Sequence, residues 1–100
     1  MAKSKALSLL GIAQRANYLI DGEERVLKAL KQGSIELIIL ASDAGDNIKK
    51  KIYQKSHYYQ IPIIDCFTQT SISSAIGRNR TLVALTDKGL AKTIQNAINS

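Results

Sequence analysis

One hundred residues suffice for one domain with a small hydrophobic core, so the sequence predicts a single domain over residues 1–100. A hydrophobic share of 45% and a charged share of 22% exclude a disordered or low-complexity chain. No apolar run approaches the ~18 residues that cross a bilayer, and a single cysteine excludes an internal disulfide and a cysteine-based zinc finger. We therefore expect a cytoplasmic protein with no membrane partner.

The hydrophobic pattern alternates between helical and strand periodicity along the whole chain. Apolar residues three or four apart indicate helices, and short β-branched apolar runs indicate strands. In chain order the pattern predicts a helix over 6–13 ending near Asn17, a strand over 18–20, a helix opened by Asp21 and Gly22 and ended by Gly33, a strand over 35–41, a helix capped by Ser42 and Asp43, a strand over 61–64, a helix from Thr70 and Ser71 to Gly77, a strand over 82–85, and a last helix capped by Asp87 or Thr86.

This order of five helices and four strands predicts the α/β fold class. Strands that alternate with helices form a parallel or mixed sheet that helices cover on both faces. We therefore expect a three-layer α/β/α sandwich around a four-stranded mixed sheet. The nearly continuous apolar run 35–41 is typical of a central strand buried on both faces.

The charge balance favours a polyanionic partner. Fourteen Lys and Arg against eight Asp and Glu leave a net charge of +6. The acids stand where helices are predicted to start, which suggests that they serve as caps and dipole partners. These acids are Asp21, Glu23, Glu24, Asp43, Asp46 and Asp87. For any single Lys or Arg, the alternative interpretation is that it lies on a solvated helix face and binds nothing.

The residues suited to catalysis are few. His57 is the only histidine, and Cys66 lies in an apolar segment where a thiol is usually inert. No glycine-rich phosphate loop and no metal-ligand spacing occur. The sequence therefore predicts a protein that is not an enzyme, with no catalytic residue, no metal and no cofactor.

The first candidate binding segment is Asp21–Lys28. A helix N-terminus offers unpaired N–H groups and a positive dipole, which suit a phosphate or a base edge. At ~100° per residue, Arg25 and Lys28 share one face while Val26 points to the core. The alternative is a capped surface helix with an ion pair between Glu24 and Lys28.

The second candidate segment is Ala75–Arg80. Two arginines around Asn79, between a predicted helix and a predicted strand, indicate an exposed basic loop with flexible reach. The alternative is a simple turn, in which Gly77 and Asn79 supply positive φ angles. The two segments are neighbours only if both lie at the same end of the sheet.

The order and spacing of these motifs resemble the L7Ae-type ribosomal proteins, a family that binds kink-turn RNA. The likeness spans about residues 5–98. It rests on Gly22 followed by Lys28 and Ala29, on the strand 37–41 running into Ser42–Ala44, on Ile61–Pro62, and on Ala75 and Gly77 before the final strand and helix. The resemblance implies an α/β/α sandwich whose second helix starts in the widened groove at tandem sheared G·A pairs.

The resemblance also implies roles for single residues. Gly22 would allow close backbone approach, and Lys28 would be the cationic contact to a base or phosphate. Glu24 and Arg25 stand where the family has Asn and Glu, and a basic loop replaces a commonly apolar one, so the family comparison implies more reliance on phosphates. The predicted RNA-binding residues are Gly22, Glu23, Glu24, Arg25, Lys28, Lys31, Ala75, Gly77, Arg78, Asn79 and Arg80.

The expected partner is therefore a structured, kink-turn-like RNA, with the ribosome as a further expected partner and the chain as a monomer. The whole chain would then be a single RNA-binding domain. A protein-interaction adaptor on the same fold is the alternative, because a fold does not determine a function.

Overall fold

The computed structural model describes residues 2–99, and its elements follow the predicted order. These elements are α1 (Ala2–Arg15), β1 (Leu19–Asp21), α2 (Glu23–Lys31), β2 (Leu37–Leu40), α3 (Asp46–Tyr59), β3 (Ile63–Ile64), α4 (Gln69–Ile76), β4 (Leu82–Leu85) and α5 (Lys88–Asn99). Among residues 2–99, no helix has both the length and the apolar character that a bilayer crossing requires.

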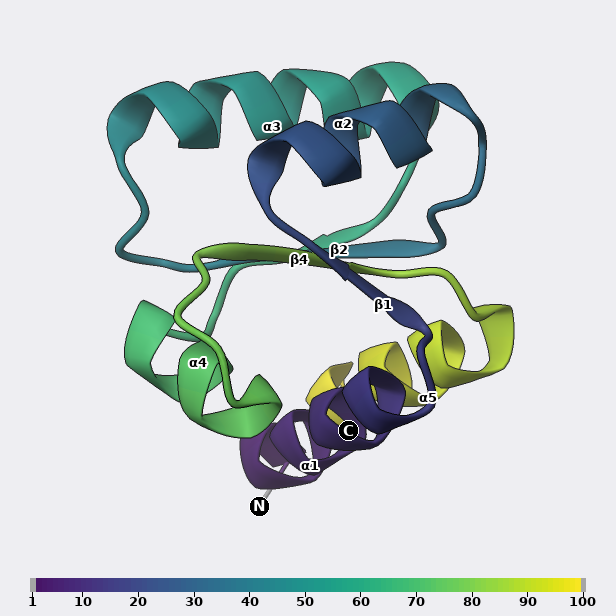
Figure 1. The fold of residues 1–100 in the computed structure, drawn as a ribbon, viewed down its shortest axis with the longest axis vertical. Helices are drawn as coiled ribbons and strands as arrows, with labels where there is room; N and C mark the ends of the chain where they lie inside the picture. The colour runs from purple at the N-terminus through teal and green to yellow at the C-terminus, as the bar shows by residue number, and fades with distance from the viewer. Residues whose placement is uncertain (1, 100) are drawn as a thin grey trace.

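The helices form two layers on opposite faces of one sheet. Helices α2 and α3 cover one face, and α1, α4 and α5 cover the other (Figure 1). The strand order is β1-β4-β2-β3, in which β4 pairs antiparallel with β1 and with β2, while β2 and β3 are parallel. The predicted three-layer sandwich with a mixed four-stranded sheet is thereby confirmed.

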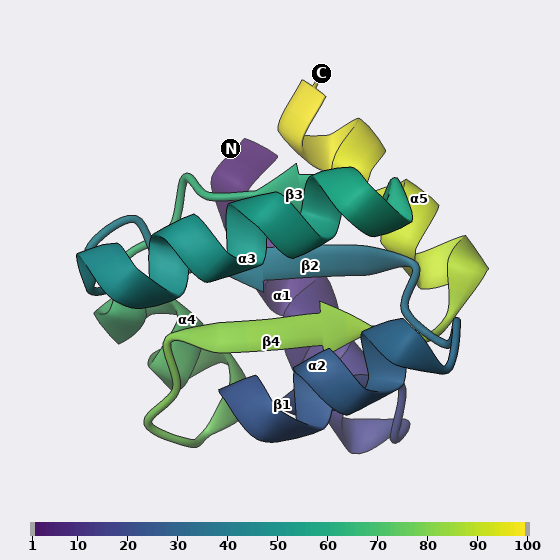
Figure 2. The ribbon, with the colours of Figure 1, turned by 90° about the horizontal axis from the view of Figure 1, so that it is seen from above.

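The two central strands form the core of the molecule. Every residue of β2 and of β4 is buried, because helices lie above and below them (Figure 2). Ile38 of β2 stands opposite Ala84 of β4, which is in turn opposite Ile20 of β1. The apolar run 35–41 is therefore the buried strand that its composition predicts, although the regular strand covers only Leu37–Leu40.

The prediction of Asp21 as a helix cap is wrong. Strand β1 begins and ends one residue later than the predicted segment 18–20, so Asp21 is its last residue and is buried. Helix α2 begins after Gly22, and no side chain caps it. Position in the strand therefore turns Asp21 away from the helix amides and into the protein.

Asp43 does cap a helix, but not the predicted one. Helix α3 begins at Asp46 after Gly45, without a side-chain cap. The Asp43 carboxylate instead accepts a hydrogen bond from the backbone N–H of Gln69, the first residue of α4, with N and Oδ1 2.8 Å apart. An exposed carboxylate after β2 thus meets a helix start that is distant in sequence but adjacent in the fold.

The last two helix starts lie close to their predicted positions. Helix α4 begins at Gln69, and its cap is Thr68, whose hydroxyl accepts from the backbone N–H of Ser71. The prediction of Thr70 and Ser71 as the start is therefore one residue too late. Asp87 accepts from the backbone N–H of Leu90 at 2.8 Å, which confirms Asp87 as the cap of α5.

Candidate nucleic-acid interface

The junction of β1 and α2 depends on the backbone conformation of Gly22. Its φ of 89° and ψ of 148° are accessible almost only to glycine. A Cβ at this position would meet no atom within 4 Å, so conformation rather than crowding requires glycine here. The first turn of α2 has no side-chain cap, and it therefore presents its N–H groups outward.

Asp21, immediately before this glycine, is surrounded by three arginines. The carboxylate is 5% exposed, and Arg25 Nη1 donates to its Oδ1 at 3.1 Å. Arg78 Nη1 donates to Oδ2 at 3.1 Å. Arg80 Nε also lies 3.1 Å from Oδ2, but outside hydrogen-bonding geometry, so this contact is one of charge. We call Asp21, Arg25, Arg78 and Arg80 the arginine cluster.

The arginines keep the Asp21 carboxyl ionised. Burial alone would raise the pKa of this carboxyl, because it disfavours the charged form. The hydrogen bond from Arg78 and the positive charges of Arg80 and Arg78 outweigh that effect and lower the pKa below its ordinary value of 3.8. The cluster therefore contains a buried negative charge at neutral pH.

The basic loop after α4 is held in place rather than free. Gly77 ends α4 in the left-handed conformation, with φ of 74°. Ser73 Oγ accepts from the backbone N–H of Arg80 at 3.0 Å, and Gln69 Nε2 donates to Asn79 Oδ1 at 2.6 Å. These bonds place the loop against α4, so the expectation of flexible reach is wrong, and Asn79 is a structural member of the loop.

The structure thus joins the two segments that the sequence proposed separately. Arg25 comes from the start of α2, whereas Arg78 and Arg80 come from the loop before β4. Asp21 contacts all three, although Arg78 is 57 positions away in sequence. Sequence reasoning missed this role of Asp21; a carboxylate at the end of an apolar strand, four residues before an arginine, was the available signal.

The remaining predicted residues of α2 point elsewhere. Glu23 forms an ion pair with Lys51 of α3, with Nζ and Oε2 2.7 Å apart. Glu24 and Lys28 form no ion pair within residues 2–99, so the predicted alternative of a helix-surface pair is not present. Lys28 and Lys31 line a groove between α2 and α3.

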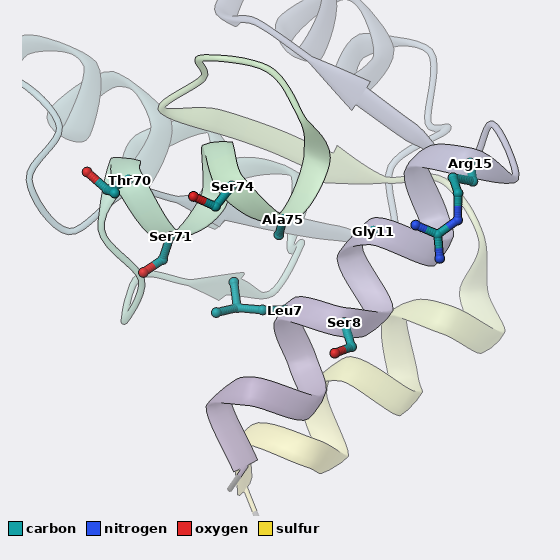
Figure 3. Close-up of a pocket in the computed structure, with 8 residues that line it drawn as sticks. All are labelled: Leu7, Ser8, Gly11, Arg15, Thr70, Ser71, Ser74 and Ala75. Carbon is teal, nitrogen blue, oxygen red and sulfur yellow. The ribbon is translucent and has the colours of Figure 1, made fainter.

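Ala75 lies apart from the arginine cluster. It lines an open groove of about 540 Å³ between α1 and α4, shown in Figure 3. Its side chain points toward α1, and its carbonyl oxygen would be 3.0 Å from a Cβ at Gly11. This close helix contact accounts for a small residue on each side, so Ala75 packs α4 against α1.

Charged hydrogen-bond donors dominate the chemistry of the arginine cluster. Within residues 2–99, no group of three or more His, Cys, Asp or Glu side chains is placed to hold a metal ion. The guanidinium groups are planar donors that bind phosphate oxygens in pairs. This arrangement suits the recognition of a polymer with a phosphate backbone.

Comparison with known sequences finds one protein family and relatives that match most of the chain. A profile of the ribosomal protein L7Ae/L30e/S12e/Gadd45 family matches residues 4–94. RNA-binding protein YlxQ of Enterococcus faecium is 35% identical over 96 residues, covering 96% of this chain and 93% of the relative. RNA-binding protein YlxQ of Bacillus subtilis (strain 168) is 34% identical over 87 residues, covering 86% and 87%.

Comparison with solved structures extends this similarity to three dimensions. A protein of unknown function from Bacillus halodurans C has a TM-score of 0.92 and 40% identity, covering 96% of this chain and 98% of its own. The Giardia lamblia 15.5kD RNA binding protein has a TM-score of 0.80, covering 98% and 85%. Its identity is only 16%, so it supports the shared fold alone.

Proposed function

The chain belongs to the ribosomal protein L7Ae/L30e/S12e/Gadd45 family, and on this premise we propose that it is an RNA-binding protein whose ligand is a kink-turn or similar internal loop. The observation that carries the proposal is the meeting of the α2 start and the basic loop at Asp21. Two segments that are far apart in the sequence form one positively charged surface there. The names of the curated relatives agree with an RNA ligand.

The arginine cluster supplies attraction to the RNA backbone. Three guanidinium groups against one carboxylate leave two positive charges in excess. The side chains of Arg25, Arg78 and Arg80 are 67%, 51% and 41% exposed, so each keeps donors toward solvent. Phosphate contacts of this kind position an RNA without reading its sequence.

The start of α2 supplies recognition of the internal loop. The uncapped N–H groups that follow Gly22 can donate to electron-rich base edges or a phosphate. Lys28 is exposed one turn further along the same helix, within reach of the RNA groove that the α2 start would enter. We assign base contact to Lys28 and the α2 start, and phosphate contact to the loop.

Arg25 and Glu24 alter how this surface reads RNA. They stand where the resembled family has Glu and Asn, and Glu24 has only acceptors, so it cannot donate to a base as Asn does. The positive charge of Arg25 is balanced by Asp21, which makes the reversal compatible with folding. We therefore assign a larger share of the RNA affinity to phosphate contacts in this chain than in a chain with a side-chain amide at position 24.

The decisive experiment compares two RNAs that differ only in the internal loop. One is a labelled kink-turn, and the other has its sheared G·A pairs replaced by Watson–Crick pairs; both are titrated at three salt concentrations. We expect preferential binding of the kink-turn and a decline of log affinity with log salt. Equal affinity for both RNAs would contradict loop recognition. An absence of RNA binding would contradict the proposal and favour the adaptor function.

We further propose that the target RNA belongs to the ribosome and that the protein acts on it as a cytoplasmic monomer. The family description as ribosomal proteins supports this target. Sedimentation of the tagged protein through a sucrose gradient checks it. We expect cosedimentation with ribosomal particles that RNase treatment abolishes, and a monomer mass by light scattering for the purified protein. A position at the top of the gradient before RNase treatment would contradict ribosome association.

A further inference from the structure

Helices α2 and α3 enclose a groove that is separate from the arginine cluster. They run side by side in the same direction over one face of the sheet (Figure 2). The groove has a volume of about 340 Å³, and we call it the α2–α3 groove. Its lining residues are Leu27, Lys28, Lys31, Lys55 and Tyr59.

The two helices are in register along this groove. The ion pair between Glu23 and Lys51 lies one helical turn before Leu27 and Lys55, which in turn lie one turn before Lys31 and Tyr59. The ion pair therefore marks the end nearest the α2 start. It also pairs the charge of Lys51 with an acid.

The lysines of the groove have no opposing charge. Lys28, Lys31 and Lys55 form no ion pair within residues 2–99, and no acidic residue lines the groove. Three lysines that line one concavity create a positive potential that attracts an anion. Because nothing within the described chain neutralises them, the complementary occupant is a polyanion.

The floor of the groove is apolar and aromatic. Leu27 and Tyr59 are half-buried, and the Tyr59 ring packs edge-on against Tyr58, with centroids 4.9 Å apart and planes at 87°. Tyr58 is 76% exposed and lies beside the groove rather than in its lining. An aromatic surface bordered by lysines is the combination that binds unpaired nucleotides, through base stacking and phosphate attraction.

We propose that the α2–α3 groove binds a single-stranded segment of RNA that continues from the structured element. This proposal rests on the proposed function, since Lys28 is shared by the groove and the α2 start. The α2 residues that line the groove run from Leu27 to Lys31, which is ~6 Å along a helix that rises ~1.5 Å per residue. A stacked strand that rises ~3.4 Å per nucleotide places about two nucleotides along this length.

The test measures the gain in affinity that an unpaired tail confers. The kink-turn RNA is titrated blunt, with a tail of about six nucleotides at the 3′ end, and with the same tail at the 5′ end. We expect one tailed RNA to bind about tenfold more tightly than the blunt RNA, the effect of one or two stacked bases. Lys55→Ala and Tyr59→Leu should reduce this gain while the blunt RNA binds as before.

Conservative and remote variants separate the groove from general effects. Tyr59→Phe keeps the ring and should retain the gain, which shows that the ring and not the hydroxyl is needed. An unchanged melting temperature of Tyr59→Leu excludes a structural cause for its loss. Lys88→Ala removes the same charge as Lys55→Ala from an exposed position on α5, across the sheet, and should leave the gain intact. A photoreactive uridine in the tail should crosslink to Tyr58 or Tyr59.

The outcomes distinguish the groove from the RNA-binding proposal itself. Equal affinity for blunt and tailed RNAs, with the kink-turn still preferred, would overturn the groove proposal and leave the proposed function standing. Crosslinking of the tail elsewhere would also overturn it. Absence of binding to every RNA would overturn both. A dimer that persists when RNA is added would show that a second copy of the chain occupies the groove, and would also overturn the groove proposal.

Discussion

The arginine cluster and the α2–α3 groove are both basic, but they hold their charges differently. In the cluster, a buried carboxylate holds three guanidinium groups at distances of 3.1 Å. In the groove, the lysines have no ionic partner within residues 2–99. The first surface is therefore organised before any ligand arrives, whereas the second depends on a ligand to order it.

The difference has a thermodynamic consequence for binding. A planar guanidinium that is already oriented loses little conformational entropy when it meets a phosphate. A free lysine side chain loses more of its rotamer freedom, ~0.5–1.5 kcal/mol for each side chain immobilised. We therefore expect the cluster to determine the geometry of RNA docking and the groove to add affinity.

The double variant Arg78→Ala/Arg80→Ala should have the largest effect. It leaves the buried Asp21 charge with Arg25 alone, and removing partners from a buried charge costs about 3 kcal/mol of unfolding free energy. Loss of two phosphate contacts should also flatten the log affinity against log salt plot by up to ~1.8 units. Chemical denaturation measures the unfolding free energy, and titration at three salt concentrations measures the slope.

Two controls test this interpretation of the arginine pair. Lys88→Ala/Lys92→Ala removes two positive charges from exposed positions of α5 and should change neither quantity appreciably. Adding Asp21→Asn to the arginine double variant should restore part of the lost stability, because no charge is then stranded. Strictly additive losses would show that Asp21 does not organise the arginines.

Asp21→Asn alone should have the second-largest effect. We expect a loss of about 1.5–3 kcal/mol of unfolding free energy at neutral pH, the range for hydrogen bonds to charged groups. Because the pKa of Asp21 is lowered by folding, its contribution is full above its ordinary value of 3.8 and is lost as pH falls through the lower folded pKa. Melting temperatures of the two proteins should therefore converge in acid. A constant difference down to about pH 2 would contradict this account.

Lys28→Ala tests the boundary between the two regions, because Lys28 lies near the α2 start and also lines the groove. We expect a loss of about 1–3 kcal/mol in the preference for the intact kink-turn over its Watson–Crick variant. The melting temperature should stay nearly unchanged, because an exposed lysine without an ion pair contributes little to folding. An unchanged preference in the folded variant would remove Lys28 from the site.

Lys50→Ala should have the smallest effect. Lys50 is exposed on α3, outside both the arginine cluster and the α2–α3 groove. Its charge acts only as diffuse attraction that salt screens, so stability should change by less than about 0.5 kcal/mol and RNA preference not at all. A large loss of discrimination in this variant would show that α3 reads the RNA more broadly than the groove.

The sequence alone determined the elements, their order and the buried centre of the sheet. Helical and strand periodicities are local properties, so the apolar runs at 35–41 and 82–85 identify their strands without knowledge of their partners. Gly77 as the end of a helix and Asp87 as a cap follow from the same local chemistry. These features depend on neighbours only a few residues away.

Tertiary structure alone decided which charged groups meet. Asp21 looks like a helix cap in sequence, yet a shift of one residue places it at the end of β1, facing an arginine 57 positions away. Asp43 likewise caps a helix that starts 26 positions later. A buried carboxylate requires whichever cations the packing of strands and helices brings to it, and that packing arises from long-range burial that no local pattern records.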